Sequence, residues 1–80
     1  MPAMTVQAYV LVQTEVSSSA VCSQIREVEG IESAEDVSGP YDVIARVVAD
    51  NLDELGRLVV SQVQRIEGVT RTLTCPIVKL

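Results

Sequence analysis

One short segment of this chain occurs twice. Residues 23–31 read SQIREVEGI and residues 61–69 read SQVQRIEGV, in a chain of 80 residues. Each copy combines the end of an amphipathic helix, a glycine at which the helix must stop, and a β-branched residue that opens an extended segment. Because this pattern is duplicated, we expect an α+β fold made of two similar strand–helix–strand halves.

Four segments have the pattern of strands. Apolar and polar residues alternate over residues 5–14 and 41–49, which predicts two strands that each bury one face. Residues 31–37 predict a weaker strand that carries three acidic side chains, and residues 69–80 predict the last strand. The expected buried positions of the two strong strands are Val6, Ala8, Val10 and Val12, then Val43, Ala45, Val47 and Ala49.

Two segments have the helical period. The first helix is expected to begin at the serines at 17–19, which offer N-cap hydroxyls, and to end at Gly30. The second is expected to be capped by Asp50 or Asn51 and to end at Gly68. Their apolar positions recur at three- and four-residue steps, at Val21, Ile25 and Val28 and at Leu52, Leu55, Val59, Val63 and Ile66.

The position of each strand in the sheet also follows from its residues. Pro76 has no amide hydrogen, so the last strand belongs at an edge or a bulge. The charged second strand suits the other edge, which leaves the two apolar strands in the centre. The prediction is a four-stranded antiparallel sheet of order 4-1-3-2 with two helices on one face, the ferredoxin-like β-α-β-β-α-β arrangement.

The composition argues against an enzyme and against nucleic-acid binding. Six basic residues face eleven acidic ones, and a net charge of -5 repels nucleic acid and anionic membranes. There is no histidine, which excludes a Ser-His-Asp triad and a Cys-His pair. Without histidine or a Cys-x-x-Cys motif, we expect no metal and no other cofactor.

The remaining bulk features indicate a small intracellular domain. Residues 1–80 are expected to form one domain, without a signal peptide and without an apolar run near the roughly 20 residues of a spanning helix. Cys22 and Cys75 fit small buried hydrophobes in a reducing cytosol, although they would also be able to meet across an interface. We therefore expect a soluble cytoplasmic protein.

The face of the sheet that the helices leave uncovered predicts a contact surface. Its expected residues are Gln7, Tyr9, Leu11, Gln13, Asp42, Ile44, Arg46 and Val48, with Val78 added from the edge strand. An apolar centre with polar ends is typical of an interface, whereas scattered exposed hydrophobes are the plainer alternative. We favour a homodimer through the sheet faces, with Tyr9, Leu11, Ile44 and Val48 in the interface.

The connection between the two halves, residues 36–42, is the best candidate for a binding site. One interpretation is a hairpin turn with an aromatic residue at its corner. The other is a ligand loop, in which backbone amides bind an anion, Gly39 allows close approach and Asp42 receives an ammonium group. Hydroxyls of Thr70, Thr72 and Thr74 would add polar contacts, although threonine is also an ordinary strand residue.

The same residues resemble a known family. The segment Gly39-Pro40-Tyr41-Asp42 resembles the Gly-x-Tyr-Asp signature of the Lrp/AsnC effector-binding domain, also called the RAM domain. The flanks match as well, at residues 31–34 and 68–74, and the resemblance covers almost the whole chain.

The resemblance implies a dimer formed through the sheets, higher oligomers such as octamers, and amino-acid effectors bound between dimers near the signature loop. Gly39, Tyr41 and Asp42 match the signature, while Ser38 and Thr72 match by location only. Full-length members carry an N-terminal helix-turn-helix that binds DNA. Since Met1 stands just before the first strand, we expect a stand-alone module without direct nucleic-acid contact that regulates full-length Lrp/AsnC members through mixed assembly.

Three functions are thus open at the level of the sequence. The first is an amino-acid-sensing and oligomerisation module that assists transcription regulation, and the second is a purely structural assembly domain. The third is a small dimeric α+β-barrel enzyme, which the lack of histidine and tryptophan disfavours.

Overall fold

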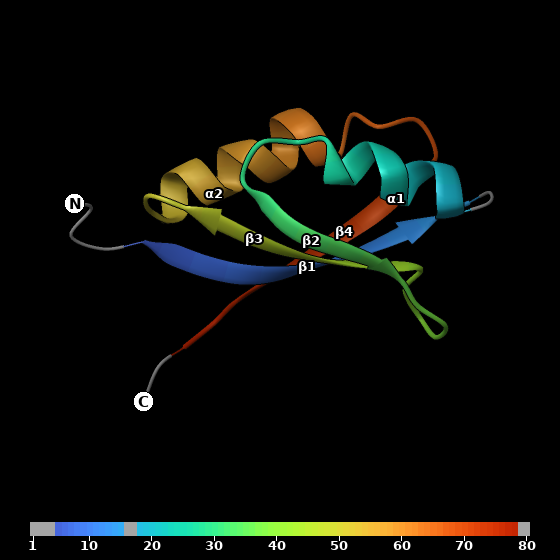
Figure 1. Cartoon of the computed structure of the whole chain (residues 1–80), viewed down its shortest axis with the longest axis horizontal. Coiled ribbons are helices and arrows are strands. Elements are labelled where there is room, and N and C mark those ends of the chain that lie inside the picture. Colours follow the sequence, from blue (N-terminus) through green and yellow to red (C-terminus); the bar gives the residue numbers. More distant parts are fainter. Residues whose placement is uncertain (1–4, 16–17, 79–80) are drawn as a thin grey trace.

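The computed structural model describes residues 5–15 and 18–78. Within them, four antiparallel strands form one sheet of order β2-β3-β1-β4, and both helices lie on one side of it (Figure 1). The predicted order and the ferredoxin-like arrangement are therefore confirmed. The elements in chain order are β1 (Val6–Thr14), α1 (Ser18–Arg26), β2 (Ile31–Asp36), β3 (Val43–Ala49), α2 (Leu52–Leu58), the π-helical turn η1 (Val59–Val63) and β4 (Val69–Pro76).

The core lies between the sheet and the helices, where the alternation of the strands predicts it. The central strands β1 and β3 pair from Val6 opposite Ala49 to Val12 opposite Val43, so their apolar faces coincide. Side chains from α1 and α2 cover that face. The buried hydrophobic residues are Ala8, Val10, Val12, Val21, Cys22, Ile25, Ala34, Val43, Ala45, Val47, Leu55, Val59 and Val63.

The two glycines of the duplicated segment have the same conformation. Gly30 follows α1 with φ of 101°, and Gly68 follows η1 with φ of 102°. Residues with a Cβ rarely adopt this left-handed backbone, which explains why each copy has glycine at this position. The helical segments themselves end earlier than predicted, α1 at Arg26 and η1 at Val63, and turns connect these ends to the two glycines.

The helix ends differ from the predictions in detail. The cap of α2 is Asn51, whose Oδ1 accepts a hydrogen bond from the backbone nitrogen of Glu54 at 2.8 Å. Leu52 is 59% exposed rather than buried, because it stands in the first turn beyond the edge of the core. After Leu58 the helix widens into the π turn η1, which the apolar spacing of the sequence did not predict. The expected serine cap of α1 lies outside the described residues.

All four strands are shorter than predicted at one end, and β1 begins at Val6, one residue late. Strand β4 stops at Pro76 instead of Leu80, and Pro76 is a residue that cannot donate to a ladder. Strand β2 ends at Asp36, one residue early, and strand β3 begins at Val43, since Tyr41 and Asp42 belong to the β2–β3 connection. Among the described helices, none is long and apolar enough to cross a membrane.

Candidate functional site

The β2–β3 connection is an exposed loop held firmly at its base. The backbone nitrogen of Val37 donates to the oxygen of Asp42 at 2.9 Å, and the nitrogen of Asp42 donates to the oxygen of Val12 at 2.9 Å. Gln13 Nε2 donates to the oxygen of Pro40 at 3.1 Å. Between these anchors, residues 38–40 are exposed and Gly39 has φ of 152°. The loop therefore presents its tip to solvent on a fixed base.

The carboxylate of Asp42 already has a structural partner. Its Oδ2 accepts a hydrogen bond from the backbone nitrogen of Thr14 at 2.8 Å and a second from Thr14 Oγ1 at 3.3 Å. The sequence analysis assigned the Asp42 carboxylate to ligand binding and did not predict its hydrogen bonds to Thr14. Asp42 therefore joins the end of β1 to the loop and fixes the direction of its own carboxylate.

The five predicted ligand residues do not come together within one chain. Four of them, Ser38, Gly39, Tyr41 and Asp42, lie in the β2–β3 connection. Thr72 lies on β4 opposite Val12, so strand β1 separates it from that connection. Its Oγ1 accepts a hydrogen bond from Gln64 Nε2 at 2.8 Å, which directs the hydroxyl toward the helix side of the sheet. Gln64 and residues 69–72 line a cavity of about 370 Å³.

The predicted interface residues do share the open face of the sheet. In the register of β1 and β3, Tyr9 stands opposite Arg46, Leu11 opposite Ile44 and Gln7 opposite Val48. The side chains of all these residues point away from the helices, since the residues that alternate with them form the core.

Strand β4 adds residues to the open face that the sequence reading missed. Leu73 is paired with Leu11 and is 46% exposed, and Cys75 is paired with Tyr9. Cys75 is exposed, so the expectation of two buried cysteines holds for Cys22 alone. Val78, which we expected on this face, lies past the end of β4 and is 73% exposed. The two-residue spacing of Arg71, Leu73 and Cys75 in the sequence would have indicated that these residues share the open face.

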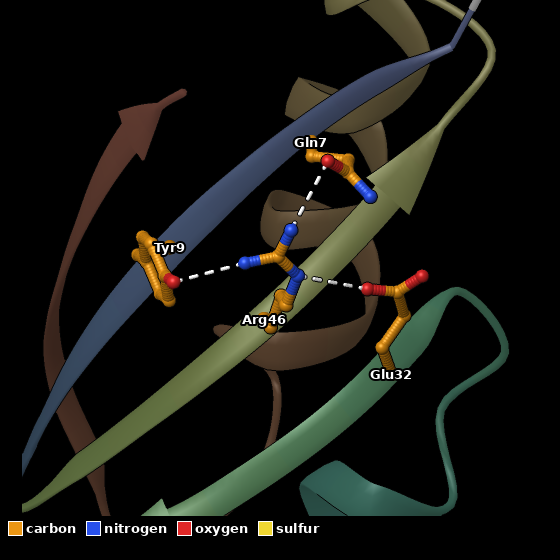
Figure 2. A network of polar contacts seen from close by, with 4 residues as sticks. All are labelled: Gln7, Tyr9, Glu32 and Arg46. Carbon is orange, nitrogen blue, oxygen red and sulfur yellow. Dashed lines mark hydrogen bonds and ion pairs between the residues drawn. The ribbon is translucent and has the colours of Figure 1, made fainter. Parts of the chain in front are cut away.

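A polar cluster occupies one half of the open face (Figure 2). The guanidinium of Arg46 donates through Nε to Glu32 Oε1 at 3.0 Å, through Nη1 to the Tyr9 hydroxyl at 2.9 Å, and through Nη2 to Gln7 Oε1 at 3.1 Å. Its centre is 5.4 Å from the Tyr9 ring centroid. The charge of Arg46 is thus matched inside the chain, and the face is less uniformly apolar at its centre than we expected.

A register shift in β2 brings Glu32 to this cluster. Ile31 pairs with Val47, but Ser33 rather than Glu32 pairs with Arg46. The extra residue is a β-bulge, which re-aims a side chain at the edge of a sheet. No alternation pattern in the sequence indicates it.

A larger cavity lies at the other end of the sheet from the β2–β3 loop. It has a volume of about 540 Å³ and is formed by the α1–β2 connection, the end of β3, α2 and η1. Charged side chains on its wall are Glu29, Asp50, Glu54 and Arg57, and none of the predicted ligand residues is among its lining residues. Among the described residues, no group of three or more metal-binding side chains is close enough to hold an ion.

Comparison with known proteins identifies the family. The family described as the Lrp/AsnC ligand binding domain matches residues 6–79. The chain belongs to the Lrp/AsnC family. This domain is a regulatory ligand-binding domain, so the family assignment favours a regulatory effector-binding role over catalysis.

Relatives of this Lrp/AsnC domain occur in larger proteins. An uncharacterised HTH-type transcriptional regulator of Pyrococcus horikoshii is 31% identical over 71 residues, covering 84% of this chain and 47% of the regulator. The chain thus spans about half the length of that relative. A homocitrate synthase of Sulfurisphaera tokodaii is 28% identical over 80 residues, which is 98% of this chain and 17% of the enzyme.

Solved structures share the fold of this Lrp/AsnC domain. The protein TTHA0845 of Thermus thermophilus has a TM-score of 0.86 and 29% identity, and the match covers 94% of this chain and 95% of that one. The complex of the transcriptional regulator NMB0573 of Neisseria meningitidis with L-Met has a TM-score of 0.81 at 14% identity, over 92% of this chain and 50% of that one.

Proposed function

We propose that this Lrp/AsnC domain senses an amino acid at the β2–β3 loop and transmits its binding through a homo-oligomeric or mixed assembly in the cytoplasm. The observation that carries the proposal is the loop itself. It contains the family signature Gly39-x-Tyr41-Asp42, exposes its tip, and is fixed at its base by the Asp42–Thr14 hydrogen bonds.

The chemistry of the loop suits a zwitterion. A free amino acid needs hydrogen-bond donors for its carboxylate and an acceptor for its ammonium group. The exposed backbone around Ser38 and Gly39 supplies the donors. A carboxylate offers about four acceptor positions, of which Thr14 uses two at Asp42, so acceptor capacity is left for an ammonium group.

The separation of Thr72 from the loop supports a site shared between chains. Ser38, Gly39, Tyr41 and Asp42 come from one end of β3, whereas Thr72 lies beyond β1 on the far edge strand. We therefore propose that Thr72 contributes to the site on a loop of a neighbouring chain. The L-Met complex of the Neisseria protein is an example of an amino acid bound to a protein of this fold.

The open face supports a dimer as the unit of assembly. Tyr9, Leu11, Ile44 and Val48 form its apolar part, and Leu73 extends it. Covering Arg46 leaves no unpaired charge, because Glu32 neutralises it and the described contacts use all three guanidinium nitrogens. We propose that such dimers assemble further, as octamers or as mixed rings with full-length Lrp/AsnC regulators.

A thermal-shift screen of the twenty amino acids tests the sensing function. An effector at 100 times its Kd stabilises the folded protein by about 2.7 kcal/mol, which raises the unfolding midpoint measurably. The Asp42→Asn variant should lose this shift, whereas Asp53→Asn, a matched change on the exposed surface of α2, should keep it. If no amino acid raises the midpoint, the domain is an assembly module without this effector.

Sedimentation equilibrium at micromolar concentration tests the assembly. We expect the mass of a dimer or a multiple of it. A monomer of 8.6 kDa throughout the concentration range would refute assembly through the open face.

A further inference from the structure

The open face carries opposite charges at its two edges. Glu35 on β2 pairs with Ile44, and Arg71 on β4 pairs with Gln13, so both side chains stand on the open face. Both are exposed, and neither forms an ion pair or hydrogen bond with another described residue. Glu32 adds a second acidic residue on the β2 side, although Arg46 neutralises it. One edge of the face is therefore acidic and the other is basic.

A second copy is able to stack on this face in two aligned ways. Two packed sheets keep their strands within about 30° of each other, and a dimer of identical chains has a two-fold axis. If the axis runs along the strands, β2 of one copy lies over β4 of the other. If the axis runs across the strands, β2 lies over β2 and β4 lies over β4.

The charges discriminate between these arrangements. With the axis across the strands, the acidic edges face each other, and the Glu35 carboxylates of both copies are brought together without a described cation to match them. With the axis along the strands, each acidic edge faces a basic edge. Packed sheets are about 10 Å apart, a gap that a glutamate and an arginine side chain reaching from opposite sides bridge.

We infer that a second copy of this chain covers the open face with the two-fold axis along the strands, and that Glu35 pairs with Arg71 of the partner subunit at both edges. The inference rests on the proposed dimer and adds its orientation. The same arrangement exchanges β1 and β3, so Leu11 of one copy lies over Ile44 of the partner subunit, because Leu11 and Ile44 stand opposite each other in the sheet. Apolar contacts then form the centre and two ion pairs close the edges.

A charge-swap experiment tests this orientation. The dimer dissociation constant is measured by sedimentation at low salt for Glu35→Arg, for Arg71→Glu and for the double variant. Each single reversal places like charges at two symmetric positions and should raise the dissociation constant about tenfold. The double variant restores opposite charges and should return the constant to near its original value. High salt should reduce both effects.

Matched controls carry the same charge changes away from the face. Glu67→Arg and Arg65→Glu lie on the exposed connection between η1 and β4 and should leave the dissociation constant within about twofold of the original. Circular dichroism verifies that each variant is folded.

Two results would overturn the orientation. A double variant as weak as the single ones would mean that the two edges do not meet. A dimer that tolerates all three changes would refute the ion pairs and leave the proposed dimer standing. An unmodified chain that stays monomeric would refute the dimer itself.

Discussion

Asp42 joins the signature loop to the end of strand β1, because its Oδ2 accepts hydrogen bonds from both the backbone nitrogen and the hydroxyl of Thr14. A residue that we propose to bind the ligand thus has a structural partner inside the chain. Its substitution is expected to affect both stability and binding, and the two effects need different variants to separate them.

The first prediction concerns that separation. Asp42→Ala removes the oxygen that accepts the hydrogen bonds from the Thr14 nitrogen and hydroxyl, which should lower the free energy of unfolding by about 1–3 kcal/mol. Asp42→Asn keeps an acceptor oxygen and should lose less than half of that amount. Urea unfolding measures both variants. Equal stability of Asp42→Ala and the original chain would mean that the bond to Thr14 contributes nothing.

The second prediction concerns Arg46 at the centre of the open face. Arg46→Ala leaves the Glu32 carboxylate in the proposed dimer interface without its cation, and truncating one partner of a covered charge pair costs about 2–5 kcal/mol of association free energy. The control is Arg57→Ala, which breaks the exposed Arg57–Glu54 pair at 3.6 Å and should change association by less than about 0.5 kcal/mol. Sedimentation equilibrium compares the two. Equal effects would place Arg46 outside the interface.

Alternation along the strands predicted the layers of this fold well, because burying one face of β1 and β3 requires an apolar residue at every second position. Proline and charge at the edges then predicted the strand order. The predictions of burial fail at positions where exposure depends on which element packs against the residue. Leu52 fits the helical period, yet it is exposed in the first turn of α2, and Cys75 is apolar in type but lies on the open face of an edge strand.

The contacts within the candidate site could be predicted from the sequence only in part. The signature residues Gly39, Tyr41 and Asp42 lie within four consecutive residues, so one short segment of sequence contains them all. The Thr14–Asp42 bond and the Glu32 bulge depend on strand pairing over longer separations. No pattern within either segment records such a pairing.

The third prediction compares two glycines. Gly30→Ala forces a Cβ into a backbone with φ of +101°, at 2.6 Å from Leu58 Cδ1 and 3.2 Å from the oxygen of Val48, and should destabilise the fold by about 1–3 kcal/mol. Gly56→Ala meets no atom within 4 Å in α2 and should stabilise the fold by up to about 1 kcal/mol. Urea midpoints give the signs. A stabilising Gly30→Ala would contradict the left-handed conformation.

The fourth prediction concerns the reactivity of the two thiols. Cys75 is exposed and should react with iodoacetamide in the folded protein, whereas buried Cys22 should react only after unfolding. Because Cys75 stands opposite Tyr9 on the open face, its labelling should slow as the concentration rises and the proposed dimer forms. Mass spectrometry of labelled peptides follows each site. A labelling rate of Cys75 that does not depend on concentration would argue against a dimer that covers this part of the face.

The fifth prediction is the alkaline dependence of stability. Burial raises the pKa of the Cys22 thiol above its ordinary value of 9.0, and the negative charge of Asp36 raises the pKa further. As the pH rises above 9.0, the unfolded chain loses this proton while the folded chain keeps it, so the free energy of unfolding should fall. The stabilisation is complete below the ordinary pKa and disappears as the pH passes through the raised pKa. Cys22→Ala removes the group and should show a smaller decline in urea unfolding between about pH 8 and pH 10. Identical declines in the two proteins would mean that Cys22 titrates alike in both states.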